Sequence, residues 1–212
     1  MNPVEKINRR IEQEVCHSTI ESLTDNNLME DYHNCISVKN RVSDLSIILD
    51  NNGLDQTTKQ CILRDYIKHL IPPGTKGVIR GNKFNSIVKG YIENLSLNPQ
   101  HYDVCFEKKH TSYITSEIPD WYISHKETNK IIIGMNQLDL WNGGHQINRG
   151  SKYLLDNALN TENCKILCVV CNETRIKSEN NKAFKLFEVG FKNDTLCYLK
   201  NLSNIIKLFF QI

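Results

Sequence analysis

Three polar side chains stand where a metal-dependent reaction could be carried out. Gln137 and Asp139 lie two residues apart inside a run of β-forming residues, and Asp120 lies seventeen residues before Gln137. Side chains alternate along a strand, so Gln137 and Asp139 are expected on the face that also carries Met135 and Trp141. Two carboxylates and an amide oxygen are donors of the kind that Mg²⁺ prefers. A Mg²⁺ ion bound there would lower the pKa of a water molecule and neutralise charge that builds on a phosphorane.

The same three residues also allow an ordinary interpretation. Asp120 follows Pro119 and could be a turn residue, while Gln137 and Asp139 could form the solvent-facing side of an edge strand. The register of the strands decides between the two interpretations, and a sequence alone does not determine register.

A predicted β-hairpin positions these residues. The segments "DWYISH" and "KIIIGMNQLDLW" flank the polar turn "KETN", which is the pattern of two antiparallel strands. Asp120 begins the first segment, far from the turn, and Gln137 and Asp139 lie toward the end of the second. We therefore expect all three residues at the open end of the hairpin.

The remaining elements predict an α/β fold with a mixed central β-sheet flanked by helices. Apolar spacing indicates helices at 3–24, 42–50 and 55–70, the last with Asp55 as N-cap and "IPPG" as its stop, and then an amphipathic helix capped by Asn82. From about residue 111 the expected order is strand ("TSYITSEI"), hairpin, helix (146–160), buried parallel strand ("KILCVVC"), helix ("KAFKLFEVGF"), strand ("LCYLKN") and helix ("SNIIKLFF"). This order predicts a helical N-terminal region, 1–75, and an α/β core, 76–212.

Positive charge is concentrated before the predicted sheet. The net charge is only +2, but residues 1–58 hold five Lys/Arg and ten Asp/Glu, whereas residues 59–90 hold seven Lys/Arg and one Asp. Arg80, Lys83 and Lys89 are expected near the start or on the polar side of the amphipathic helix, where they could follow phosphates. An ordinary solvated helical face is the alternative.

The segment after the hairpin carries further candidates. Gly143 and Gly144 would let the backbone approach a ligand closely, and His145 beside them could accept a proton as a neutral imidazole. The predicted helix places an amide, a guanidinium and a phenol on one face, where they could hold a phosphate: Gln146, Arg149 and Tyr153. A surface histidine and a solvated helical face are the alternatives. Trp141 could stack on a base or belong to the core.

Composition narrows the class of protein. The N-terminal segment has no apolar signal core, and no apolar stretch approaches the roughly 20 residues of a membrane span. The eight cysteines are therefore expected as reduced thiols of a cytoplasmic, intracellular protein. Cys168 and Cys171 have the spacing of a zinc knuckle, but no second pair or close histidine completes a site, so core packing is favoured.

These motifs resemble those of the PD-(D/E)XK nuclease superfamily, the fold of many type II restriction endonucleases. Pro119-Asp120 matches the "PD" element, and "QLD", 137–139, stands where an acid-x-Lys element ends the next strand. "HQINRGSKY" resembles the helix that follows that strand, and "RGNKFN" resembles the helical segment before the sheet. The order of elements agrees over roughly residues 76–200.

The resemblance implies a type II-like restriction enzyme, a Mg²⁺-dependent endonuclease that hydrolyses double-stranded DNA and leaves 5′-phosphates. Asp120 and Asp139 would bind Mg²⁺, and Gln137 would support the metal or a water molecule. Gln146 and Arg149 would hold the scissile phosphate. A palindromic target implies a two-fold homodimer, and a restriction role implies a partner DNA methyltransferase.

Two departures from the family pattern leave other functions open. Gln137 stands where the family has an acid, and Asp139 stands where the family has the lysine that orients or deprotonates the attacking water. Asp139 could serve as metal ligand or as general base, but not fully as both. The alternatives are a non-catalytic nucleic-acid-binding module on a decayed nuclease core, and a repair or RNA-processing nuclease of the same fold.

Overall fold

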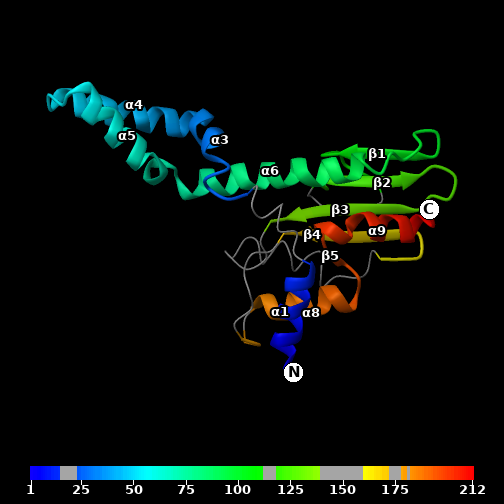
Figure 1. The fold of residues 1–212 in the computed structure, drawn as a ribbon. Coiled ribbons are helices and arrows are strands. Elements are labelled where there is room, and N and C mark those ends of the chain that lie inside the picture. Colours follow the sequence, from blue (N-terminus) through cyan, green and yellow to red (C-terminus); the bar gives the residue numbers. More distant parts are fainter. Residues whose placement is uncertain (15–22, 112–117, 139–159, 172–177, 181) are drawn as a thin grey trace. The chain divides into compact units, whose positions relative to one another are not determined.

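The computed structural model describes residues 1–14, 23–111, 118–138, 160–171, 178–180 and 182–212, which form seven helices and five strands (Figure 1). Contacts divide the chain into two compact units. One comprises Met1–Ile20 and Phe84–Ile212 and holds the sheet, and the other is Glu21–Lys83. None of the helices in the described ranges is both long and apolar enough to cross a membrane.

The first unit contains one five-stranded mixed sheet in the order β1-β2-β3-β4-β5. Its strands are β1 (Tyr102–Phe106), β2 (Trp121–His125), β3 (Ile131–Gln137), β4 (Cys164–Val170) and β5 (Leu196–Tyr198). The pairings β1–β2 and β2–β3 are antiparallel, and β3–β4 and β4–β5 are parallel. The predicted α/β class is confirmed. The predicted hairpin is also confirmed, with strands Trp121–His125 and Ile131–Gln137, as is the buried parallel strand, which spans Cys164–Val170 where "KILCVVC" was predicted.

Apolar side chains of the central strands pack against helices on both faces of the sheet. One face carries Ile133 and Ile166, which lie in a core cluster with Ile7 of α1 (Pro3–Glu14) and Phe187 of α8 (Lys182–Lys192). The other face meets α9 (Leu199–Phe210) and the second half of α6 (Pro73–Glu93) (Figure 1). Burying each large apolar side chain contributes about 1.5–3 kcal/mol, so the sheet is a rigid base for residues at its ends.

Helix α6 begins earlier than predicted. It starts at Pro73, so Asn82 lies in its interior and the predicted N-cap is wrong. Proline suits the first turn of a helix because its φ is preset and the N–H it lacks would have no intrahelical partner there. Arg80 and Lys83 therefore lie in the middle of the helix and not near its start.

Three further boundaries differ from the prediction. The first strand is Tyr102–Phe106, which was not predicted. The predicted strand "TSYITSEI", 111–118, lies outside the described residues except for its two ends, which are not in a strand. Strand β5 ends at Tyr198 because α9 begins at Leu199, so the expected strand "LCYLKN" is shorter and the closing helix longer. Helix α1 is described as Pro3–Glu14. Of the remainder of the predicted 3–24 helix, residues 15–22 lie outside the described part, and residues 23 and 24 are not helical.

The second unit is helical, as predicted for this part of the chain. It contains α3 (Met29–Asn34), α4 (Ile36–Asn51), α5 (Gln56–Leu70) and the first part of α6. Asp55 is confirmed as the N-cap of α5, since its Oδ1 accepts hydrogen bonds from the main-chain nitrogens of Thr57 and Thr58, each at 3.0 Å. Helix α5 ends at Leu70, where "IPPG" was expected to stop it.

Asp25 links two elements of this unit and predicts a pH dependence of its stability. Its Oδ2 accepts a hydrogen bond from Lys76 Nζ at 2.7 Å, and its Oδ1 accepts one from Tyr32 Oη at 2.8 Å. The hydrogen bond from Lys76 is the main cause that lowers the pKa of Asp25 in the folded state, although burial opposes it. A carboxylate with a lowered folded-state pKa stabilises above its unfolded pKa of about 3.9, and that stability is lost as the pH falls through the folded value.

We therefore expect Asp25→Asn to lower the melting temperature at pH 7 and to have a smaller effect near pH 3. The loss at pH 7 should be at most about 1 kcal/mol, because the ion pair is partly exposed to solvent. Melting curves of both proteins from pH 7 to pH 3 measure the difference. Asp44→Asn on α4 is the control, since Asp44 is exposed and forms no ion pair with other described residues. A difference that does not depend on pH would contradict the prediction.

Candidate functional site

The open end of the β2–β3 hairpin brings Asp120 against the last residues of β3. Asp120 directly precedes β2, and its main-chain nitrogen donates to the Gly134 carbonyl at 3.1 Å. Its carboxylate oxygen Oδ2 accepts a hydrogen bond from the main-chain nitrogen of Asn136 at 2.6 Å. Asn136 is followed by Gln137, the last residue of β3. The predicted approach of Asp120 to this strand end is confirmed.

Gln137 is buried at the end of a central strand. Strand β3 is paired on both sides, with β2 and with β4, where Gln137 lies opposite Val170. The side chain is 5% exposed, so the ordinary interpretation of Gln137 as the wet side of an edge strand is wrong. Alternation places Gln137 on the face of Met135, as predicted, and the register places Asp120 on that face too.

A hydrogen-bonded network on the opposite face holds the end of β3 in place. Trp121 Nε1 donates to Asn136 Oδ1 at 3.0 Å, and Asn136 Nδ2 donates to Asn85 Oδ1 of α6 at 3.1 Å. The side chain of Asn136 is thus fixed from two elements, while its main-chain N–H binds the Asp120 carboxylate. Alternation along β3 places Asn136 on the face opposite Gln137, but the sequence analysis gave Asn136 no role. A polar residue inside an apolar strand was the available signal.

The chain leaving β1 also reaches the Asp120 end of the sheet. The main-chain nitrogen of Glu107 donates to the Asp120 carbonyl at 3.0 Å, so the segment "EKKH", 107–110, starts beside Asp120. The His110 ring contacts the Tyr122 ring edge-on, with 4.8 Å between centroids. Burial lowers the pKa of His110, and a hydrogen bond with Cys105 is the largest cause that raises the pKa of Tyr122 to about 12. Sequence reasoning missed this segment because it missed β1.

Of the three cations predicted on the amphipathic helix to bind phosphates, Lys89 lies in the same unit as Asp120. Its ammonium is 5.1 Å from the centroid of the Phe106 ring, and Phe106 pairs with Trp121, the residue after Asp120. Lys89 is therefore directed toward the end of β1 that neighbours the candidate site. Arg80 and Lys83 belong to the unit Glu21–Lys83.

The other predicted site residues lie outside the part of the chain that the structure describes, and their roles stay predictions. They are Asp139, Trp141, His145, Gln146, Arg149 and Tyr153. The predicted helix at 146–160 also falls almost wholly in this segment, 139–159.

The donors present are of the right type for Mg²⁺. The carboxylate of Asp120 and the amide oxygen of Gln137 are hard ligands, and Mg²⁺ keeps several waters, so few protein ligands are needed. Within the described ranges no three His, Cys, Asp or Glu residues are grouped to hold a metal ion, and Asp139 stands outside those ranges. Cys168 and Cys171, the pair with zinc-knuckle spacing, are buried, Cys168 in the core cluster.

Exposure divides the site into a buried floor and an accessible rim. Gln137 and Trp121 are buried, Asp120 and Asn136 are half-buried, and Glu107 with the lysines after it is exposed. A bulky substrate could thus approach Asp120 from the side of the 107–110 segment.

Comparisons of the chain with protein-family models, with curated proteins and with solved structures found no match.

Proposed function

We propose that this protein is a Mg²⁺-dependent DNA endonuclease, similar to PD-(D/E)XK restriction enzymes, that hydrolyses double-stranded DNA to leave 5′-phosphates. The observation that carries the proposal is the 2.6 Å hydrogen bond between the Asp120 carboxylate and the main-chain nitrogen of Asn136. It brings the aspartate of the "PD" element to the strand end where the second motif, Gln137 to Asp139, begins.

The order of elements gives further support. Helix α6 is followed by three antiparallel strands and then by a strand parallel to the third, which is the order that the resemblance predicts. The half-buried position of Asp120 also suits a metal ligand, because a carboxylate that is partly removed from water attracts a cation more strongly.

In the proposed reaction, Asp120 and Asp139 would hold Mg²⁺, and Gln137 would support the metal or a water molecule. The bound metal would lower the pKa of the attacking water and offset charge at the phosphate. Lys89 binds a neighbouring backbone phosphate, and Gln146 and Arg149 hold the scissile one.

The family lysine is absent, so another group must accept the proton of the attacking water. His145 was predicted for this role from its position after the two glycines. His110 is a further candidate, because its ring packs on Tyr122, two residues from Asp120 on the same face of the sheet. Its lowered pKa keeps the imidazole neutral at pH 7, the form that accepts a proton.

A non-catalytic nucleic-acid-binding module is the second candidate function. It is favoured by the replacement of the family acid by Gln137, whose side chain is uncharged and buried. Such a protein would bind DNA equally well with and without Mg²⁺, whereas an enzyme with a metal site at Asp120 requires the cation for cleavage.

The test is incubation of the purified chain with mixed double-stranded DNA, single-stranded DNA and RNA in Mg²⁺, with EDTA as control. We expect discrete double-stranded fragments with 5′-phosphates that are absent in EDTA. Sedimentation of the protein bound to DNA that contains a palindromic cleavage site should give the mass of a complex with two copies of the chain. Cleavage of RNA alone would instead support the RNA-processing alternative. Tight DNA binding with no cleavage in Mg²⁺ or Mn²⁺ would contradict the endonuclease proposal and support the binding module.

A further inference from the structure

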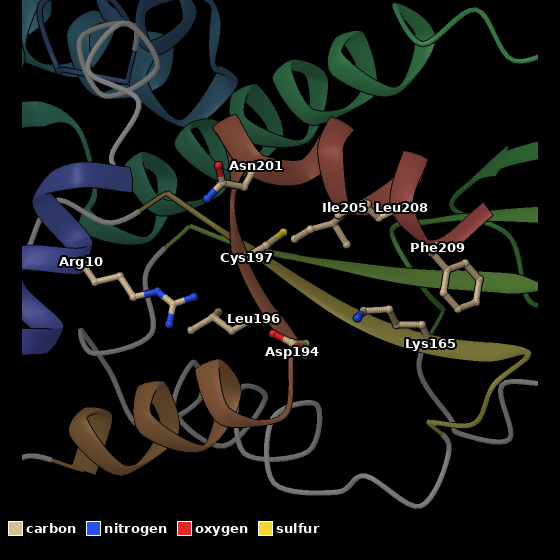
Figure 2. Close-up of a pocket in the computed structure, with 9 residues that line it drawn as sticks. All are labelled: Arg10, Lys165, Asp194, Leu196, Cys197, Asn201, Ile205, Leu208 and Phe209. Carbon is tan, nitrogen blue, oxygen red and sulfur yellow. The ribbon is translucent and has the colours of Figure 1, made fainter. Parts of the chain in front are cut away.

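A cavity of about 360 Å³ lies beside the short strand β5, away from Asp120. Its lining includes Arg10 of α1, Lys165 of β4, Asp194 before β5, and Ile205, Leu208 and Phe209 of α9. Figure 2 shows Arg10 at one end of the cavity and Lys165 with Phe209 at the other. The cavity therefore combines cationic groups with an apolar wall.

A mismatch in strand length leaves this space. Strand β5 has three residues and pairs only with Cys168–Val170, although β4 begins at Cys164. Among the described residues no strand covers the outer edge of the first part of β4. The main-chain nitrogen of Ile166 instead donates to Asn160 Oδ1 at 2.7 Å. The cavity thus lies beside the part of β4 that β5 does not cover.

Lys165 is the one charged residue in β4 and is half-buried. Because Ile166 belongs to the core cluster on the α1 and α8 face, alternation directs Lys165 to the α9 face. Lys165 forms no ion pair with a carboxylate of the described residues, and Asp194, which also lines the cavity, is exposed. An ammonium that is partly removed from water without a counter-ion binds an anion more strongly than an exposed one.

A second ammonium adds to the positive charge at the same end. Lys130 Nζ lies 3.4 Å from the Phe209 carbonyl oxygen and 5.7 Å from the centroid of the Phe209 ring. Ile132 pairs with Lys165, and Lys130 lies two residues earlier on the same face. The carbonyl at the end of α9 already binds Lys130, so of the two lysines at this end Lys165 is the one that a ligand would meet.

We propose that this cavity binds a small organic anion, with its acidic group at Lys165 and its apolar body against Ile205, Leu208 and Phe209. Leu208 is 77% exposed, so an apolar wall faces solvent at the opening, where a ligand would cover it. The volume is at the lower end of the range of about 300–1,000 Å³ for small-molecule sites. A carboxylate or a phosphate monoester on an aryl or short alkyl group has the required chemistry.

The test is calorimetric titration of the full chain with 3-phenylpropionate, phenyl phosphate and the neutral 3-phenylpropanol. We expect at least one acid to bind, and the alcohol to bind about tenfold more weakly or not at all, because it lacks the charge that Lys165 pairs with. Lys165→Met keeps the apolar stem and removes the charge, so it should weaken the acid about tenfold and leave the alcohol unchanged. Lys207→Met is the matched control, since Lys207 lies on α9, is exposed and does not line the cavity.

A second variant separates loss of binding from loss of folding. Leu208→Glu changes an exposed position and places a carboxylate on the apolar wall, so it should weaken the acids while the melting temperature stays unchanged. The proposal is overturned by failure of both acids to bind at millimolar concentration, by equal binding of the alcohol, or by wild-type affinity in Lys165→Met. These outcomes are independent of whether the protein cleaves DNA.

Discussion

Asp120→Asn is expected to abolish DNA cleavage while leaving the fold intact. The asparagine side-chain oxygen can still accept the hydrogen bond that the main-chain nitrogen of Asn136 donates to Asp120 at 2.6 Å. The charge that would bind Mg²⁺ is removed. A loss of about 4 kcal/mol of transition-state stabilisation corresponds to about a thousandfold in rate. Initial rates of plasmid cleavage in Mg²⁺ measure the effect, and melting curves check that the fold is retained.

Asp103→Asn provides the matched control for this variant. Asp103 is an exposed carboxylate on β1 of the same sheet, where it lies 3.2 Å from Lys126 Nζ. It pairs with Ser124, near the turn of the hairpin and away from the Asp120 end. We expect its cleavage rate to equal that of the wild type, and DNA binding to survive in both variants. Cleavage by Asp120→Asn within about threefold of the wild type would exclude Asp120 as a metal ligand.

Gly134→Ala is expected to destabilise the sheet strongly. Gly134 pairs with Trp121, and a β-carbon built on Gly134 would lie inside the Trp121 indole. The indole is 1% exposed and its nitrogen is bonded to Asn136, so it cannot move aside without losing both packing and a hydrogen bond. Overpacking a buried site of this kind costs about 3 kcal/mol. For a chain of this length, that loss lowers the melting temperature by about 6–12 °C.

The cause of this requirement is space, not backbone conformation. Gly53 is the one described glycine with a positive φ, so the backbone at Gly134 would accept alanine. Gly90→Ala in α6 is the control, because no atom beyond its chain neighbours and the surrounding helix backbone lies within 4 Å of its added β-carbon. Alanine in a helix is favoured over glycine by up to about 1 kcal/mol, so this variant should be neutral or stabilising.

A double-mutant cycle tests the assigned contact. If the indole is what the new methyl group meets, Gly134→Ala should cost much less in a Trp121→Leu background than in the wild type. Additive losses of stability would show that Gly134 is required for another reason. Trp121→Leu also removes the donor to Asn136, so cleavage should be measured beside stability in all three variants.

Elements with strong local signals were predictable from the sequence. The apolar run "KILCVVC" is typical of a strand buried on both faces, and "KETN" between two β-forming runs predicted the hairpin. Asp55 was identified as an N-cap because its side chain acts on residues two and three positions later. These interactions join residues that are close together in the sequence, so the sequence pattern predicts them.

Boundaries that depend on tertiary context were not predictable. The start of α6 at Pro73 was missed because "PPG" reads as a helix stop, although its second proline begins the next helix. Strand β1 is short and partly exposed, and its sequence, "YDVCF", does not stand out from the neighbouring residues as an apolar run. It becomes a strand because it pairs with β2, which only the folded chain supplies.

The candidate site shows the same division between local and long-range information. The sequence by itself determined which groups the site carries, namely the carboxylates of Asp120 and Asp139 and the amide of Gln137. It also predicted the hairpin whose open end holds Asp120 and Gln137. Only the tertiary structure decided that Asp120 binds the main chain of Asn136, that Gln137 is buried, and that Asn85 and His110 belong to this end of the sheet. Composition and spacing encode which groups a segment carries, but strand register and the packing of distant segments select which of those groups meet.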